Sequence, residues 1–390
     1  MPPRPRGSSS PGSASTVPGM ASTTTYPVLG PRALNRATLD RQLLLRRAPL
    51  TAEQAVDHLV GLQAQNTKPP YYALAARLDG FRPADLSGLM ESRTVARIVT
   101  LRSTVHTHTA RDAVALRGFV QAGAIDRELS LFRKGLAGVD LDRLAARSRA
   151  LVEERPRTPK ELREELLRDW PDADPQSLSV AARCLLPLVQ VTPRGLWGRS
   201  GRVALTTADA WFDGPAPGPA DPGATALRYL AAFGPASVKD MQTWCGLTRL
   251  RPAFERLRPR LLAFRDEHGT ELFDLPDAPR PDEDTPAPPR FLPEFDNLLL
   301  SHADRTRVVP PAHRARTWTG NQAHRVFLLD GFLAGIWHLA EEKDRTTLTV
   351  EPFAPVTSAQ RTALTAEAER TLRITVPEGV PYDIVFTQER

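Results

Sequence analysis

The sequence of 390 residues is long enough for two to four domains, and hydrophobic residues make up 41% of it, so we expect most of it to fold. Mean hydropathy is −0.32, and no apolar run approaches the roughly 18 residues of a membrane span. The formal net charge is +6 and the pI is about 9.7. Nucleic acid is a natural partner for such a surface, although the excess of arginine over lysine is also typical of a GC-rich genome.

The N-terminal stretch is rich in Pro, Ser, Gly and Thr and has no apolar block. Residues 1–30 are therefore predicted to be a disordered leader rather than a signal peptide, with Met20 as an alternative start. The two cysteines, Cys184 and Cys245, stand far apart without a partner motif. This spacing fits a reducing cytoplasm and argues against a cysteine-bound metal.

Residues 31–112 are predicted to form a first winged helix, in which helices are followed by a β-hairpin. Helices are expected over residues 35–47, 51–65 and 83–93, and two strands around a bend over residues 96–109. The stretch GLQAQNTKPPYYAL, which begins at Gly61, places Gln63 and Gln65 where the second of these helices ends. Without further context, such a pair is a polar helix end beside a loop.

A second winged helix is predicted over residues 113–210. Thr158 and Glu161 form a capping box at the start of one helix, with Pro159 at its first position, and a second helix follows over residues 174–189. Two β-rich arms then flank a Gly-rich tip. Three arginines lie in this tip, and we expect them to contact the DNA backbone: Arg194, Arg199 and Arg202.

Residues 223–276 are predicted to be a third winged helix, whose hairpin turns at His268-Gly269. An acidic, Pro-rich linker follows over residues 277–290, and residues 291–390 have a β-rich pattern with a hairpin turn at Asp330-Gly331. The predicted fold class is α+β, with tandem winged-helix (helix-turn-helix) motifs followed by a C-terminal β-barrel. Winged helices also serve as protein-contact modules, so DNA binding does not follow from this fold alone.

The order of these stretches resembles the winged-helix DNA glycosylase family of AlkZ and its bacterial relatives. The family mark is a Gln–apolar–Gln or Gln–apolar–Asp motif, which here is Gln63-Ala64-Gln65. Three further stretches support the resemblance: LRSTVHTHTARD (101–112), LPEFDNLLLSHADRTRVV (292–309) and VFLLDGFLAGIWHL (326–339). The resemblance runs from about Leu34 to the C-terminus. It implies that Gln63 and Gln65 are the catalytic pair, and that relatives act on N7-alkylpurines and unhook bulky crosslinks.

A glutamine pair is chemically reasonable for this reaction even though an amide does not ionise near neutral pH. An N7- or N3-alkylated purine is already cationic, and its departure neutralises it, so little acid catalysis is needed. The bond breaks through an oxocarbenium-like state, and we expect two amide oxygens to orient a water molecule and to face the sugar cation. The expected activity is that of a monofunctional DNA glycosylase on double-stranded DNA with alkylated purines, in base excision repair or self-resistance.

Other polar residues near the motif have more than one interpretation. Lys68 could form a Schiff base, but a contact with phosphate or water is the simpler role. Arg102 and His106 could point at the same DNA backbone as the glutamines, or belong to a solvated wing. His106 and His108 alternate on a strand and so face one side. They supply at most two metal ligands, and we expect neither a metal nor another cofactor.

The alternative function is a non-catalytic winged-helix DNA-binding protein, such as a transcriptional regulator. A regulator normally reads a repeated operator as a two-fold dimer, and this sequence shows no obvious dimer arm. We therefore expect a monomeric glycosylase in the cytoplasm, associated with the nucleoid and not with a membrane. The sequence does not indicate which lesion is preferred.

Overall fold

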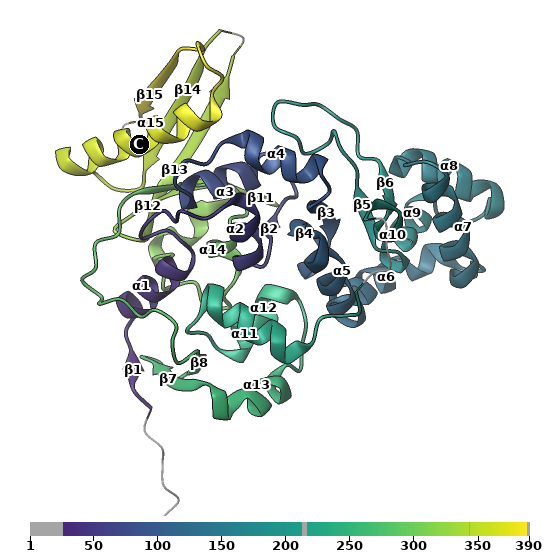
Figure 1. The fold of residues 1–390 in the computed structure, drawn as a ribbon, viewed down its shortest axis with the longest axis horizontal. Helices are drawn as coiled ribbons and strands as arrows, with labels where there is room; N and C mark the ends of the chain where they lie inside the picture. The colour runs from purple at the N-terminus through teal and green to yellow at the C-terminus, as the bar shows by residue number, and fades with distance from the viewer. Residues whose placement is uncertain (1–25, 213–216, 343, 388–390) are drawn as a thin grey trace, which may run out of the picture.

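The computed structural model describes residues 26–212, 217–342 and 344–387 (Figure 1). Most of the predicted leader, residues 1–25, lies outside the described residues. Its end differs from the prediction, because strand β1 (Val28–Leu29) pairs in parallel with strand β7 (Leu262–Asp266). The backbone at residues 27–29 thus completes the edge of a hairpin more than 200 residues away, which no local pattern could predict.

The first block contains four helices and a three-stranded part of a sheet. Its elements are α1 (Pro31–Arg41), α2 (Ala52–His58), β2 (Leu62–Gln63), α3 (Pro69–Arg77), α4 (Pro83–Glu91), β3 (Val95–Val99), the 3₁₀ turn η1 (Leu101–Ser103) and β4 (Val105–Thr109).

Helix α2 ends earlier than predicted, and this corrects the position of Gln63. Val60 and Gly61 have φ angles of 54° and 92°, which stop the helix. A Cβ atom on Gly61 would lie 2.1 Å from Nδ1 of His108, so only glycine allows this close approach. The chain then enters strand β2, and Gln63 lies on a strand rather than at a helix end.

The second block contributes six α-helices, short turns and a hairpin. Its elements are α5 (Ala110–Phe119), the π turn η2 (Gln121–Ile125), α6 (Asp126–Phe132), η3 (Arg133–Leu136), α7 (Leu141–Glu154), α8 (Pro159–Asp169), α9 (Pro175–Leu185), β5 (Leu188–Gln190), β6 (Leu205–Thr207) and the short α10 (Ala208–Trp211). The capping box of Thr158 and Glu161 is confirmed. Helix α7 was missed, although Leu144, Leu151 and Val152 recur at helical spacing behind its N-cap.

The hairpins of the first two blocks are parts of one sheet rather than separate wings. The strand order is β2-β4-β3-β5-β6, and β3 pairs with β5 through Arg97 opposite Gln190 and Ile98 opposite Val189. The division of the chain into separate winged helices therefore stays a prediction, while the strands predicted at both hairpins are confirmed.

The third block consists of helices followed by a hairpin, as its sequence predicts. It contains α11 (Pro222–Phe233), α12 (Val238–Cys245), α13 (Arg251–Leu257), η4 (Arg258–Arg260), β7 and β8 (Glu271–Asp274). Ser237 caps α12 and Gly246 ends it with a φ of 79°. The hairpin turn at His268-Gly269 is confirmed by the φ of 78° at Gly269.

The C-terminal part is an open sheet and not the predicted barrel. It contains β9 (Arg290–Leu292), α14 (Asn297–Leu300), η5 (Pro311–Thr317), β10 (Trp318–Thr319), β11 (Gln322–Ala323), β12 (Arg325–Leu329), β13 (Phe332–Glu341), β14 (Thr346–Pro352), α15 (Ser358–Thr375) and β15 (Tyr382–Phe386). The order β15-β14-β13-β12-β9 leaves the edge strands β15 and β9 unpaired with each other among the described residues. Helix α15 explains the difference, since Leu364, Ala368 and Leu372 share a core cluster with Phe327 and Trp337 and so cover one face of the sheet.

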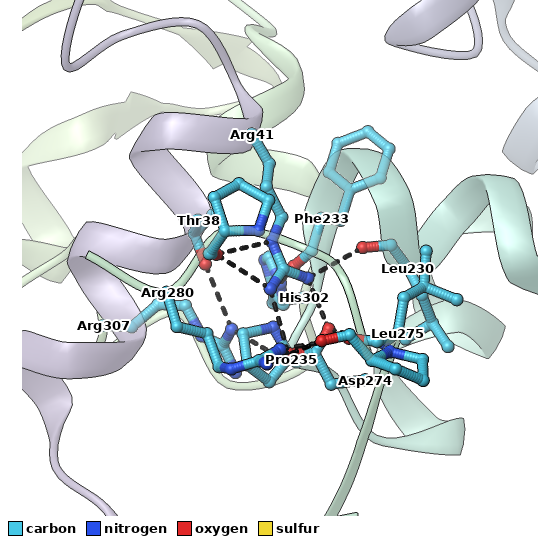
Figure 2. A network of polar contacts seen from close by, with 12 residues as sticks. Thr38, Arg41, Leu230, Phe233, Pro235, Asp274, Leu275, Arg280, His302 and Arg307 are labelled. Carbon is cyan, nitrogen blue, oxygen red and sulfur yellow. Dashed lines mark hydrogen bonds and ion pairs between the residues drawn. The ribbon is translucent and has the colours of Figure 1, made fainter. Parts of the chain in front are cut away.

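A buried polar network joins helix α1 to the third block and to the segment that follows it (Figure 2). The guanidinium of Arg41 binds both carboxylate oxygens of Asp274, at 2.6 and 2.9 Å, and the two side chains are 1% and 0% exposed. Arg41 also donates to the carbonyl oxygen of Leu230 on α11. Arg307 donates to the carbonyl oxygen of Pro235 and to the hydroxyl of Thr38. These contacts hold residues from four distant segments together.

Removal of the Arg41 guanidinium is expected to destabilise the protein strongly. The Arg41→Met variant leaves Asp274 buried with Arg280 as its one ion-pair partner among the described residues, and breaking a buried pair costs about 3–5 kcal/mol of unfolding free energy. The matched control is Arg345→Met, which breaks the exposed pair of Arg345 and Asp383 and should cost no more than about 1 kcal/mol. Urea unfolding measures the free energy of unfolding of both variants. Equal losses of this free energy in the two variants would contradict the role of the network.

Candidate active site

Strand β2 places Gln63 against strand β4. Gln63 lies directly opposite His106 in the antiparallel ladder, and Leu62 lies opposite Thr107. Opposite residues of an antiparallel pair point to the same face of a sheet. The side chain of Gln63 therefore lies beside His106, and Gln63 is only 7% exposed.

The guanidinium of Arg102 holds the amide of Gln63. Arg102 has a φ of 53° in the turn η1 between β3 and β4, and its Nη2 donates to Oε1 of Gln63 at 2.7 Å. Its Nη1 donates to the carbonyl oxygen of Trp244 near the end of α12. No carboxylate of the described residues pairs with this guanidinium. Burial lowers the pKa of Arg102 to about 10, so the side chain stays charged at neutral pH.

Two buried histidines support this contact. Nδ1 of His106 donates to the carbonyl oxygen of Thr104 at 3.0 Å, so Nε2 carries the lone pair and faces Nη2 of Arg102 at 3.4 Å. The ring of His108 stacks on that of His106 with centroids 5.5 Å apart. Burial lowers the pKa of His106 well below its ordinary value, helped by the charge of Arg102, and burial lowers the pKa of His108 to about 4.

The position of His106 corrects one sequence-based prediction. The sequence leaves a contact with the DNA backbone and a solvated wing as alternatives for this residue, but His106 is 1% exposed and lies beside Gln63. Both of its ring nitrogens have protein partners. The alternation of His106 and His108 on a strand is confirmed, and both rings are buried.

Gln65 differs from Gln63 in its surroundings, because its side chain is exposed. Its Oε1 accepts a hydrogen bond of 3.3 Å from the backbone N–H of Val105. The backbone between the two glutamines is fixed by Arg97, whose Nη2 donates to the carbonyl oxygen of Ala64 at 2.9 Å. Burial, helped by the nearby charge of Arg194, lowers the pKa of Arg97 to about 10. The motif is thus held by one buried arginine on each side.

The other predicted DNA-binding residues form two groups. Lys68 forms an ion pair with Glu341 of β13, and its ammonium group lies 5.7 Å from the ring centre of Trp197. Arg194, Arg199 and Arg202 lie in the loop between β5 and β6. Arg199 and Arg202 are exposed and, within the described ranges, have no side-chain partner.

The loop between β5 and β6 is docked on the first block through its tip. The hydroxyl of Tyr71 donates to the carbonyl oxygen of Gly195 at 2.7 Å, and the backbone N–H of Trp197 donates to Ser87 at 3.0 Å. A Cβ atom on Gly195 would lie 2.7 Å from Cδ of Arg97. The loop therefore packs against the arginine that holds the carbonyl group of Ala64.

Sequence reasoning missed Arg97 and Glu294 as parts of the site. Arg97 interrupts the apolar run of β3, and a charged residue inside a buried strand is a usable signal. Glu294 is 6% exposed and accepts a hydrogen bond of 3.1 Å from Asn66, the residue after Gln65. It also pairs with Arg325. Glu294 belongs to the stretch 292–309, which therefore lies against the motif.

The described part of the chain contains neither a membrane-spanning helix nor a cluster of metal ligands. No helix there combines the length and apolar character needed to cross a bilayer. No group of three or more His, Cys, Asp or Glu side chains is arranged there to hold a metal ion.

Comparisons with known proteins indicate a family. The model of the family described as DNA glycosylase AlkZ-like matches residues 56–374. The interstrand DNA cross-link repair glycosylase of Streptomyces sahachiroi is 26% identical over 202 residues, which cover 48% of this chain and 53% of that protein. The match thus spans about half of the length of that relative. The solved structure of Streptomyces sahachiroi DNA glycosylase AlkZ matches 92% of this chain and 100% of that chain, with a TM-score of 0.74 and 21% identity.

The buried histidines should make the stability of the protein sensitive to acid. In the unfolded chain a histidine takes up a proton near its ordinary pKa of 6.5, whereas folding lowers the pKa of His108 to about 4. The free energy of unfolding should therefore fall as the pH drops from about 6.5 to 4, because the unfolded state binds more protons. The His108→Leu variant should show a shallower fall in urea unfolding, and the same change at the exposed His338 is the control. An unchanged slope in His108→Leu would contradict this prediction.

Proposed function

Because the chain belongs to the AlkZ-like DNA glycosylase family, whose model covers most of its length, we propose that it is a monofunctional DNA glycosylase. Its reaction is hydrolysis of the N-glycosidic bond of cationic alkylated purines in double-stranded DNA. N7-alkylguanine is the proposed lesion type, and interstrand crosslinks through N7 belong to the same class. The observation that carries the proposal is the Gln63-Ala64-Gln65 motif, held in place by Arg97 and Arg102.

The chemistry of the motif limits the substrate. An amide neither donates nor accepts a full proton near neutral pH, so the site offers weak general acid or base catalysis. A cationic alkylpurine needs little acid or base catalysis. The bond between C1′ and N9 breaks with its electron pair moving to the base, and this neutralises the positive charge of the base. The remaining barrier lies in the oxocarbenium-like sugar. Preorganised dipoles and an oriented water molecule lower it, and one well-placed group contributes about 2.7–4 kcal/mol.

Gln65 is the proposed contact of the attacking water molecule. Its side chain is exposed, and its Oε1 already accepts one hydrogen bond from Val105. An amide oxygen has two lone pairs, so one remains to accept a hydrogen bond from water. This differs from the expectation that both amide oxygens face the substrate equally, since Oε1 of Gln63 faces Arg102.

Uncompensated positive charge around the motif supports DNA as the partner. Three arginines donate only to neutral acceptors among the described residues: Arg97, Arg102 and Arg194. Two exposed arginines, Arg199 and Arg202, follow Arg194 within eight residues. Phosphate groups would supply the missing negative charge. We assign Arg194, Arg199, Arg202 and Lys68 to backbone contacts, and Arg102 to the support of Gln63.

The proposed reaction leaves the DNA strand uncut. A lyase step needs an amine that attacks C1′ and forms a Schiff base. Lys68 lies three residues beyond Gln65, but its ammonium group is paired with Glu341. We therefore propose that water is the nucleophile and that the enzyme acts as a monomer. The alternative of a non-catalytic regulator has no structural observation in its favour.

Substitution of the glutamines should remove catalysis but not DNA binding. The double variant Gln63→Ala with Gln65→Ala loses water positioning and the dipoles together, so single-turnover release of N7-methylguanine should fall by about 10³ or more. Gln65→Asp should stay active, because a carboxylate there faces the positive sugar and can accept a proton from water. A binding titration in parallel checks that affinity is retained. If the double variant released N7-methylguanine at nearly the wild-type rate, the catalytic role of both residues would be contradicted.

DNA affinity should depend steeply on salt and weakly on sequence. If the arginines around the motif and in the loop between β5 and β6 neutralise roughly six phosphates, the logarithm of the association constant for DNA should fall with the logarithm of the salt concentration at a slope of about −5. Titration of an undamaged duplex at several salt concentrations measures the slope. Arg199→Gln with Arg202→Gln should reduce it by about two units. A flat salt dependence, or strong preference for one operator sequence, would contradict the proposal.

A further inference from the structure

The contact between Arg102 and Gln63 fixes which end of the Gln63 amide can reach a substrate. A guanidinium has five N–H donors and no acceptor, so the atom that meets Nη2 of Arg102 at 2.7 Å must be the oxygen Oε1. A flipped amide would place its NH₂ group against the N–H groups of Arg102. The polarity of the Gln63 side chain is therefore set by its neighbour.

The guanidinium itself has little freedom to move away. Nη1 donates to the carbonyl oxygen of Trp244 on α12, and Nη2 also faces Nε2 of His106 at 3.4 Å. Nδ1 of His106 donates to Thr104, which keeps Nε2 as an acceptor. Gly246 ends α12 with a φ of 79°, and a Cβ atom there would lie 3.1 Å from Cα of Arg102. The close approach of α12 thus holds Arg102 in place.

The opposite end of the amide is free. Nε2 of Gln63 has no hydrogen-bond partner among the described residues, and it is not one of their buried unpaired polar atoms. The nitrogen therefore still contacts solvent, although the residue is only 7% exposed. The part of Gln63 that a ligand can meet is a hydrogen-bond donor.

We propose that Gln63 acts as a hydrogen-bond donor to the departing purine, and that Arg102 is the positioning residue that sets this polarity. This inference rests on the proposed glycosylase function and deepens it. The two glutamines then have opposite roles, since Gln65 accepts a hydrogen bond from water while Gln63 donates one to the base.

The electron flow of the reaction explains the value of a donor. The bond between C1′ and N9 breaks, its electron pair moves to the purine, and the acceptor atoms of the base become richer in electrons. Water adds to C1′ and releases one proton to solvent, so the products are an abasic sugar and neutral N7-methylguanine. N3 of the purine is bonded to the same carbon, C4, as N9, and it accepts a hydrogen bond in the plane of the ring. A donor there stabilises the leaving base, whereas a donor to the sugar ring oxygen would oppose the developing cation.

The donor role also predicts a preference among cationic purines. N3 is free in N7-methylguanine but carries the alkyl group in 3-methyladenine, which then cannot accept the hydrogen bond. Excision of N7-methylguanine should therefore depend on Gln63 much more strongly than excision of 3-methyladenine does.

The test is the Gln63→Glu variant in single-turnover release of N7-methylguanine. The carboxylate keeps the shape of the side chain but removes the donor and pairs with Arg102. Release should fall by about 10²-fold or more with DNA binding retained, while Gln65→Glu keeps at least about a tenth of the wild-type rate. The control is Gln360→Glu. This residue lies far from the motif in sequence, and a glutamate there can still form the capping box of α15. A Gln63→Glu variant at or above the wild-type rate would overturn the donor role.

Two further measurements separate positioning from folding and from the proposed function. Arg102→Lys retains a donor-only group and should lose much less activity than Arg102→Met, whereas a purely structural role predicts equal losses at equal thermal stability. In the second measurement, ¹⁵N NMR follows the Gln63 NH₂ signal, assigned by its absence in Gln63→Glu. The signal should shift when abasic DNA and free N7-methylguanine are added together, and this needs no turnover. Absence of base release by the wild type would reject the glycosylase function, while absence of the shift would reject the donor contact.

Discussion

The guanidinium of Arg102 is the contact on which the arrangement of the motif depends. It joins the oxygen of Gln63, the ring of His106 and the main chain of α12, and it does so without a carboxylate partner among the described residues. Burying an unpaired charge is costly, and three neutral acceptors offset only part of this cost. The protein thus keeps a buried cation next to an amide whose direction that cation determines.

The surrounding architecture keeps this contact rigid through other buried arginines. Arg97 holds the carbonyl group between the two glutamines. Arg77 on α3 binds both oxygens of Asp296 at 2.8 Å, with both side chains almost fully buried. Arg41 makes the equivalent pair with Asp274. Bidentate pairs of this kind have defined geometry, so α3 is tied to the C-terminal part and α1 to the third block by directional contacts rather than by apolar packing alone.

Local signals in the sequence were sufficient to predict most helices and hairpins. They were not sufficient to predict which strands pair across long distances in the sequence. The caps at Thr158 and Ser237 and the turn at Asp330-Gly331 act within a few residues, and all three are found in the structure. The pairing of β3 with β5 and of β1 with β7 joins residues far apart in sequence, and no local pattern specifies such partners. The same limit applies to the site. The motif at Gln63 and Gln65 was found by resemblance, but the burial of His106 and the direction of the Gln63 amide depend on α12 and β4.

The central claim is that an uncharged glutamine pair suffices only because the substrate arrives as a cation. The most direct measurement compares single-turnover release of two bases from the same duplex sequence, cationic N7-methylguanine and neutral hypoxanthine. The account predicts release of N7-methylguanine well above its spontaneous loss and no measurable release of hypoxanthine, whose departure needs protonation. Comparable release of both bases would contradict the account, since the site would then have to activate a neutral leaving group.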